Sequence, residues 1–289
     1  MPMAAGANGQ VYSVADRNLA REIAVKFLKA PQSPGSDDID RFIDEAQITA
    51  SLEHPNVLPI HEIEVNDSGH LYFTMKKIDG RSLGEVIALS TPEARAEGIA
   101  SLNQVVSIFL SLGHALAYAH HRGIVHQDVK PDNIMLGDFG EILLVDWGSA
   151  FRIGAAGIKL YGTPLYMSPE QARLERADVL SDVYCLGATL FHALLLRPPM
   201  WHDDPDEFWR RKRAGEVDPP TDAERQRVPS ALIDLALKAL AADPARRYAS
   251  VEAMVEDLER YQAGLAASAH RYSIAEKLVR WYRRNQRAV

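Results

Sequence analysis

Residues 126–133 read HQDVKPDN, and residues 146–148 read DWG at the end of an apolar run over residues 142–145. The first stretch places a carboxylate, a lysine and an asparagine within six residues: Asp128, Lys130 and Asn133. Phosphoryl transfer needs an acceptor hydroxyl held in line, a group that takes its proton, and metal ions that neutralise phosphate charge. These side chains, with the carboxylate of Asp146, offer a base, a cation and oxygen ligands for a hard metal ion.

In this order and spacing, the two stretches resemble the catalytic loop and the metal-binding motif of the eukaryotic-like, bacterial-type Ser/Thr protein kinases. The resemblance implies that Asp128 is the catalytic base and that Lys130 stabilises the moving phosphoryl group. It also implies that Asn133 and Asp146 bind Mg²⁺ or Mn²⁺. The implied fold is α+β and two-lobed, with a small β-rich N-lobe and a larger helical C-lobe. The implied reaction transfers the γ-phosphoryl group of ATP to Ser or Thr hydroxyls of protein substrates.

A second Asp-Phe-Gly sequence at residues 138–140 spells the metal motif that the family usually carries. It lies only five residues after Asn133, between the apolar runs 134–136 and 142–145. Residues 137–141 are therefore interpreted as a hairpin turn. We assign the metal to Asp146 instead, with Trp147 filling the apolar place of the usual Phe.

The first third of the chain predicts strands and one helix. Residues 23–28 are rich in β-formers, and residues 57–65 and 71–78 read as two further strands around a turn. Residues 38–52 carry apolar side chains near helical spacing.

The resemblance places the ATP site on these elements. Lys26 would pair with Glu45, with Asp44 as the alternative partner, to position the α- and β-phosphates. Met75 would lie at the back of the adenine pocket, and the backbone of residues 76–78 would form the hinge that binds adenine. The expected ATP-binding residues are Gly6, Gly9, Val11, Ala24, Lys26, Glu45, Met75, Lys76, Lys77 and Ile78.

The remainder of the chain predicts a helical lobe. Helices are expected over residues 102–121, 179–196, 231–240 and 251–261, with short strands and turns within 124–150. The expected division is residues 1–79 for the N-lobe and hinge, 80–262 for the C-lobe, and 263–289 for a basic tail.

Four further residues are expected to support the catalytic loop. Residues 162–170 resemble the end of a kinase activation segment, and Thr163 would bond near Asp128 and Lys130. Glu170 would form a buried ion pair with Arg247. Asp182 would cap and brace the catalytic loop from the apolar helix expected over residues 179–196.

The N-terminal region departs from the family pattern. Ala4 stands where the first glycine of the phosphate loop is expected, and only three residues precede it. We therefore expect the first strand to be largely missing and the sheet edge to be unpaired. On this view the chain is either a truncated product or has its sheet completed by a partner or another segment.

Gln127 stands where many kinases of this family have an arginine that pairs with a phosphate on the activation segment. Glutamine cannot form a charge-assisted pair with phosphate. Residues 149–160 contain no hydroxyl side chain except Ser149. We therefore expect activity that is independent of activation-loop phosphorylation.

Composition sets further bounds. A formal net charge of -7 argues against nucleic-acid binding. The single cysteine, Cys185, excludes an intrachain disulfide, is expected to be buried and fits a cytoplasmic location. No signal peptide or membrane span is expected. The basic, aromatic-containing tail is interpreted either as a segment at an anionic membrane surface, next to a membrane anchor, or as an amphipathic helix that is solvated or packed on the kinase.

Two other functions compete with an active protein kinase. A pseudokinase, acting as a nucleotide-binding or interaction module, would follow from a damaged N-lobe. A small-molecule kinase of the aminoglycoside-kinase type shares a His-x-Asp loop and an Asp-Trp pair. The segment 162–170, and Asp182 with Arg247, are protein-kinase features and argue against the small-molecule kinase.

Overall fold

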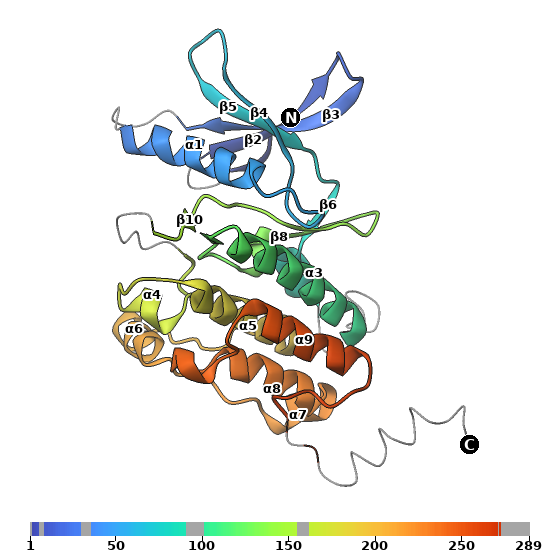
Figure 1. Cartoon of the computed structure of the whole chain (residues 1–289), viewed down its shortest axis with the longest axis vertical. Helices are drawn as coiled ribbons and strands as arrows, with labels where there is room; N and C mark the ends of the chain where they lie inside the picture. Colours follow the sequence, from blue (N-terminus) through green and yellow to red (C-terminus); the bar gives the residue numbers. More distant parts are fainter. Residues whose placement is uncertain are drawn as a thin grey trace, which may run out of the picture.

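The computed structural model describes residues 2–5, 9–29, 36–90, 101–154, 162–270 and 272. It has the two-lobed α+β architecture that the sequence predicts: a small lobe of strands with one helix lies above a larger helical lobe (Figure 1). The predicted site residues come from both lobes and from the segments where the lobes meet.

The small lobe is a five-stranded antiparallel sheet with strand order β1-β2-β3-β5-β4. Helix α1 (Ser36–Ala50) covers one face, where Phe42 packs on Phe73 with ring centroids 4.9 Å apart. Helix α1 and the strands β3, β4 and β5 lie within three residues of the positions that their apolar patterns predict. The strands are β1 (Pro2–Ala5), β2 (Gly9–Asp16), β3 (Arg21–Leu28), β4 (Ile60–Val65) and β5 (Leu71–Lys76).

The expectation of an unpaired sheet edge needs correction. Strand β1 pairs with β2 through Pro2 with Tyr12, Ala4 with Val11, and Ala5 with Gln10. Antiparallel pairing uses backbone N–H and C=O groups, so four residues are enough to cover part of an edge. The first strand is short, and it covers the part of β2 that follows the phosphate loop.

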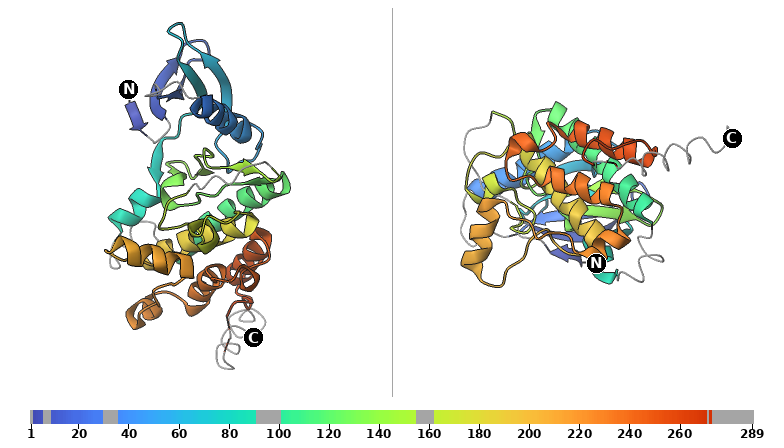
Figure 2. Two further views of the ribbon diagram at one scale, coloured as in Figure 1. Left: turned by 90° about the vertical axis from the view of Figure 1, so that its left-hand side faces the viewer. Right: turned by 90° about the horizontal axis from the view of Figure 1, so that it is seen from below.

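The large lobe is built around α5 (Val179–Leu195), of whose 17 residues 14 are buried. A helix that is apolar on all sides must lie in a core. Seen from below, α3, α5, α8 and α9 lie next to one another across this lobe (Figure 2). The other helices are α2 (Leu83–Leu89), α3 (Leu102–His121), α4 (Pro169–Ala172), α6 (Pro205–Ala214), α7 (Asp222–Arg227), α8 (Ser230–Ala239) and α9 (Val251–Gln262).

Among the described residues, α3 alone has the length and apolar composition of a membrane-spanning helix. Nine of its residues are buried in the core of the large lobe, and it packs against α9 and α5. Its apolar character is thus accounted for by burial within the fold.

Short strands and turns carry the site between the lobes. Strands β8 (Ile134–Gly137) and β9 (Ile142–Leu144) form the predicted hairpin, in which the Gly137 amide donates to the Glu141 carbonyl oxygen over 2.8 Å. Phe139 at its tip is 91% exposed, so the prediction of a turn at residues 138–140 is confirmed. The remaining elements are β6 (Gly80–Ser82), β7 (Ile124–Val125), β10 (Phe151–Arg152), and the 3₁₀ turns η2 (Pro131–Asn133) and η3 (Pro244–Arg246).

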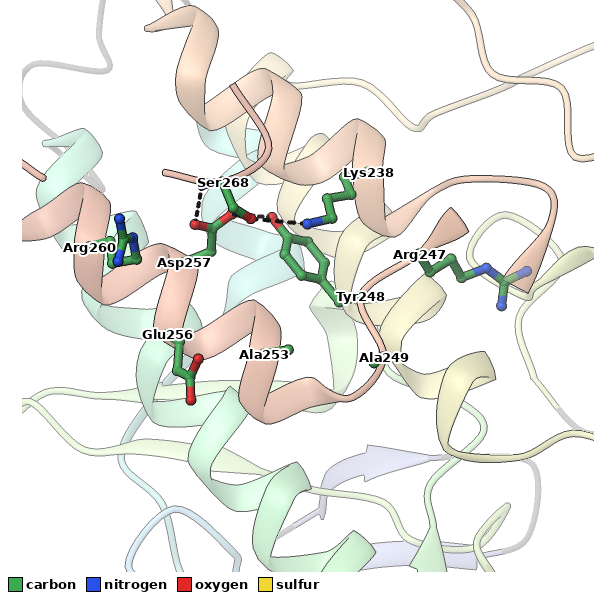
Figure 3. A pocket seen from close by; sticks show the side chains of 9 residues that line it. All are labelled: Lys238, Arg247, Tyr248, Ala249, Ala253, Glu256, Asp257, Arg260 and Ser268. Carbon is green, nitrogen blue, oxygen red and sulfur yellow. Dashed lines mark hydrogen bonds between the residues drawn. The ribbon is translucent and has the colours of Figure 1, made fainter. Parts of the chain in front are cut away.

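The segment after α9 turns back onto the base of the large lobe. The buried Asp257 carboxylate accepts hydrogen bonds from the Tyr248 hydroxyl and the Ser268 hydroxyl, over 2.8 and 2.9 Å (Figure 3). The Ala269 amide also donates to it, over 3.1 Å. The start of the predicted tail is thus anchored on the domain, while residues 273–289, with most of its basic side chains, lie outside the described residues.

Candidate active site

The catalytic loop between β7 and η2 is held from inside the large lobe by Asp182 of α5. This carboxylate is fully buried and accepts hydrogen bonds from the backbone amides of His126 and Gln127, each over 2.8 Å. Burial alone would raise the pKa of Asp182, but hydrogen bonds and positive charge, above all from His120, lower it. Gln127 is thereby held at a φ of 68°, a conformation that non-glycine residues rarely adopt.

The Asp128 carboxylate is the centre of a four-residue cluster. Its Oδ1 accepts the backbone amide of Thr163 over 2.7 Å, and its Oδ2 lies 2.8 Å from the Lys130 ammonium. The Asn133 amide donates to the same Oδ2 over 3.2 Å, and Lys130 also donates to the Thr163 hydroxyl over 2.7 Å. Asp128 is 8% exposed, so its orientation is fixed by these contacts rather than by solvent.

Asp146 follows β9 with a φ of 60° and turns its carboxylate into the space between the lobes. Its Oδ1 is 4.0 Å from the Lys26 ammonium, and the side chain is 53% exposed. The adjacent Trp147 is buried and packs on the His126 ring with centroids 4.5 Å apart. A Cβ at Gly148 would lie 3.1 Å from Glu45 Oε2, so glycine avoids a tight contact between this turn and the glutamate of α1.

Lys26 on β3 reaches Glu45 on α1, with Nζ and Oε1 2.5 Å apart. Burial raises the pKa of Glu45, Lys26 opposes this rise, and Asp146 adds to it. Asp44, the alternative partner, is exposed on the helix surface. The lysine therefore lies between two carboxylates, one from each lobe.

The predicted adenine side is apolar. Ala24 and Met75 are buried in one cluster, and Val11 and Ile78 pack against it. Met135 of β8 and Val145 just after β9 pack against the same cluster and were not among the predicted residues. Both belong to the apolar runs around the hairpin, and the side of each strand that faces the small lobe could have been inferred from their alternation.

The side chains of two predicted hinge residues, Lys76 and Lys77, form ion pairs. The Lys76 side chain pairs with Glu141 over 2.9 Å, and its amide donates to the Pro59 carbonyl oxygen over 3.1 Å. Lys77 pairs with Asp79 over 2.8 Å and with Glu22. Both lysine side chains are thus paired with carboxylates, so the predicted contact of this segment with a base would have to use its backbone.

Only half of the predicted phosphate loop is described. Gly9 begins β2, and a Cβ there would lie 2.8 Å from the Phe27 carbonyl oxygen and 3.0 Å from Lys26 Cε. Glycine at this position lets the start of β2 lie close to the Phe27 carbonyl oxygen and the Lys26 side chain of β3. Gly6 lies outside the described residues.

The predicted pair of Glu170 and Arg247 is present and bidentate, over 2.7 and 2.8 Å. Ser181 donates to the same carboxylate over 2.9 Å, and the arginine side chain is fully buried. Burial raises the pKa of Glu170, but the contacts with Arg247 outweigh it and the pKa is lowered. The pair joins the end of the activation segment to the segment after η3.

Gln127 contacts the start of the activation segment directly. Its side-chain amide donates to the Ser149 carbonyl oxygen over 2.8 Å, and its own carbonyl oxygen accepts from Gln171 over 3.0 Å. The Cys185 thiol lies 3.9 Å from the same carbonyl oxygen and is buried, as predicted. The sequence did not predict the role of Gln171, because its partner lies 44 residues away.

The donor atoms suit a hard divalent cation. The Asn133 amide nitrogen donates to the Asp128 backbone oxygen over 2.8 Å, so its Oδ1 is the atom that remains for a ligand. Within the described ranges, no three His, Cys, Asp or Glu side chains form a complete metal cage. Mg²⁺ is often bound by one or two carboxylates together with substrate phosphates, and Asp146 with Asn133 fits that arrangement.

This fold and this arrangement of side chains define a protein kinase domain. The family model described as "Protein kinase domain" matches residues 2–258, and the chain belongs to this family. It is 32% identical over 286 residues to the serine/threonine-protein kinase PknD of Protochlamydia amoebophila, and 34% identical over 285 residues to that of Chlamydia felis. Each comparison covers 90% of this chain but only 29% and 30% of the relative. The chain thus spans about three-tenths of the length of these curated relatives.

Proposed function

We propose that this chain is the catalytic domain of an active Ser/Thr protein kinase, which transfers the γ-phosphoryl group of ATP to protein Ser and Thr hydroxyls. The observation that carries the proposal is the cluster at Asp128, in which Lys130 and Thr163 are already bonded to the carboxylate and to each other. Such an arrangement fixes a base and a cation at one point, which positioning-based phosphoryl transfer requires.

The residues of this cluster and of the neighbouring ATP site have distinct proposed roles. Asp128 accepts the proton of the substrate hydroxyl, and Lys130 stabilises negative charge on the transferred phosphoryl group. Asn133 and Asp146 would hold Mg²⁺ or Mn²⁺, which when bound neutralises phosphate charge. Lys26, held by Glu45, binds the α- and β-phosphates of ATP. The segment at Thr163 places the hydroxyl in line with Asp128.

Transfer of label from ATP to dephosphorylated casein, with magnesium present, tests the proposal. We expect transfer by the parent chain and none above background for Lys26→Ala or Asp146→Asn, because the first loses a phosphate contact and the second a metal ligand. Asp138→Asn is the matched control, since Asp138 is exposed in the hairpin turn and should leave transfer unchanged. Transfer that persists in Asp146→Asn but disappears in Asp138→Asn would contradict the assignment of the metal motif.

The alternatives have less support. The pseudokinase hypothesis rested on a damaged small lobe, and β1 now pairs with β2 while Lys26 and Glu45 form their ion pair. A small-molecule kinase would not need the segment from Thr163 to Glu170, which here lies against Asp128 and is tied to Arg247. The family match also favours a protein kinase.

We further propose that activity does not depend on phosphorylation of the activation segment. Gln127 bonds to the Ser149 carbonyl oxygen, and the loop backbone is held by Asp182. The start of the segment is therefore tied to the loop without a phosphate. Phosphatase treatment of the purified chain is expected to leave casein phosphorylation unchanged. Loss of activity together with removal of a phosphate from residues 149–163 would contradict this expectation.

The proposal places the domain on the cytoplasmic side of the membrane, where ATP is available. Contact of the basic tail with an anionic membrane surface stays a prediction from the sequence, because residues 273–289 lie outside the described residues.

A further inference from the structure

Lys212 is a buried lysine that the proposed transfer reaction does not use. It lies near the end of α6, four residues after the buried Phe208, and is 2% exposed. Its ammonium donates one hydrogen bond, to the Leu165 carbonyl oxygen over 2.9 Å. Within the described part of the chain, no carboxylate lies within 4.0 Å of it. A buried lysine without a carboxylate is costly, so its retention calls for a specific contact.

The groups around Lys212 come from several elements. From α5, the Tyr184 ring centroid is 5.3 Å away, and Cys185 interacts electrostatically with the lysine. Arg247 lies over the same Tyr184 ring, at 5.0 Å, and is paired with Glu170 of α4. The positive charge of Lys212 is therefore balanced mainly by a carbonyl oxygen and an aromatic face.

Leu165 belongs to a tight turn that ends at the catalytic base. The amides of Tyr166 and Met167 both donate to the Thr163 carbonyl oxygen, over 2.9 and 3.1 Å. Thr163 in turn contacts Asp128 and Lys130. On the other side, the Tyr166 hydroxyl is hydrogen-bonded to His192 over 2.7 Å. A shift of the Leu165 carbonyl would therefore change the surface that an approaching hydroxyl meets beside Asp128.

Helix α6 is fastened to the same region at two other points. The Arg173 guanidinium donates to the Arg213 carbonyl oxygen over 2.8 Å. A Cβ at Gly215 would lie 3.0 Å from Pro169 Cγ, so the end of the helix lies directly on the start of α4. Of these three contacts, the hydrogen bond from Lys212 is the one made with the turn at residues 163–167.

We propose that Lys212 is a positioning residue, whose ammonium group holds the Leu165 carbonyl and thereby keeps residues 163–167 in the conformation that receives the protein substrate. This inference rests on the proposed kinase function. It assigns to one buried lysine an effect on substrate binding, with no part in phosphate chemistry.

The test compares Lys212→Met, which keeps the apolar volume and removes the donor, with Lys212→Gln, which keeps a neutral donor. Arg213→Met, an exposed neighbour on the same helix, is the control. For Lys212→Met we expect KM for casein to rise about tenfold, the effect of leaving the Leu165 carbonyl oxygen without its lysine donor, with kcat and KM for ATP unchanged. Lys212→Gln should restore part of the loss. An unchanged KM for casein in Lys212→Met would overturn the inference.

Hydrogen exchange of residues 162–168 gives a readout that does not need activity. We expect faster amide exchange there in Lys212→Met and not in Arg213→Met. If the parent chain fails to phosphorylate casein, the proposed function fails, and this exchange measurement still decides the role of Lys212. Equal exchange in parent and Lys212→Met would reject that role.

A pH series adds a signature of the buried charge. Burial lowers the pKa of Lys212 to about 7 from 10.5. Between these values the unfolded chain binds a proton that the folded chain does not, so stability rises with pH across this window. The melting temperature of the parent chain, relative to Lys212→Met, should therefore increase from pH 7 to pH 9. A constant difference would contradict a buried, titrating lysine.

Discussion

Replacing Arg247 with alanine is expected to lower the free energy of unfolding by about 3–5 kcal/mol, the usual cost of leaving one member of a buried ion pair alone. The Glu170 carboxylate would lose both bidentate hydrogen bonds while staying buried, with only Ser181 as a side-chain donor. The Leu180 carbonyl oxygen would lose its hydrogen bond from Arg247 as well. Urea denaturation, followed by tryptophan fluorescence, measures the change.

Arg246→Ala is the matched control for this variant, because Arg246 is an exposed arginine one residue earlier. The double variant Arg247→Ala with Glu170→Gln should recover part of the loss, since the amide carries no charge to bury. Similar destabilisation by Arg246→Ala and Arg247→Ala would show that the ion pair does not hold the segment.

Asp128→Asn is expected to lower kcat by about 10²–10⁴-fold, the range typical of removing a general base. The amide cannot take the proton of the acceptor hydroxyl, and it removes the charge that Lys130 faces at 2.8 Å. KM for ATP should change little, because the Lys26 and Glu45 pair that is proposed to hold the phosphates stays intact. Steady-state kinetics with casein measures both parameters.

A control for folding accompanies this variant. The ATP-induced shift in melting temperature should match that of the parent chain, so that a low kcat cannot be ascribed to unfolding. A kcat within tenfold of the parent, at the same degree of folding, would remove Asp128 from the role of base.

The sequence predicted the elements whose order and periodicity are local. The helix at α1 and the hairpin at residues 137–141 followed from spacing and apolar runs. The choice of Asp146 over Asp138 as the metal residue stays a prediction. Contacts between segments that are distant in the sequence were harder to predict. Gln171 reaches the Gln127 carbonyl oxygen across 44 residues, and no pattern near either residue marks that bond.

Short helices and a buried lysine were also outside what the sequence showed. Helix α6 carries a run of basic residues, and such a run is usually solvated. Lys212 is buried because it lies four residues after Phe208, on the same face of the helix. The spacing of Phe208 and Lys212 in the sequence indicates burial, but the basic residues around Lys212 indicate an exposed face. Strand β1 was underestimated because backbone pairing needs no side-chain pattern.

The two hydrogen bonds that Asp182 accepts fix the catalytic loop to the large lobe. Because one carboxylate of the core helix α5 bonds two successive loop amides, the base must travel with the large lobe as a single rigid piece. Lys26 instead belongs to the small lobe and is 4.0 Å from Asp146. A movement of one lobe relative to the other would therefore change the separation of Lys26 and Asp146, the residues proposed to bind phosphate and metal, and would leave the contacts of Asp128 unchanged.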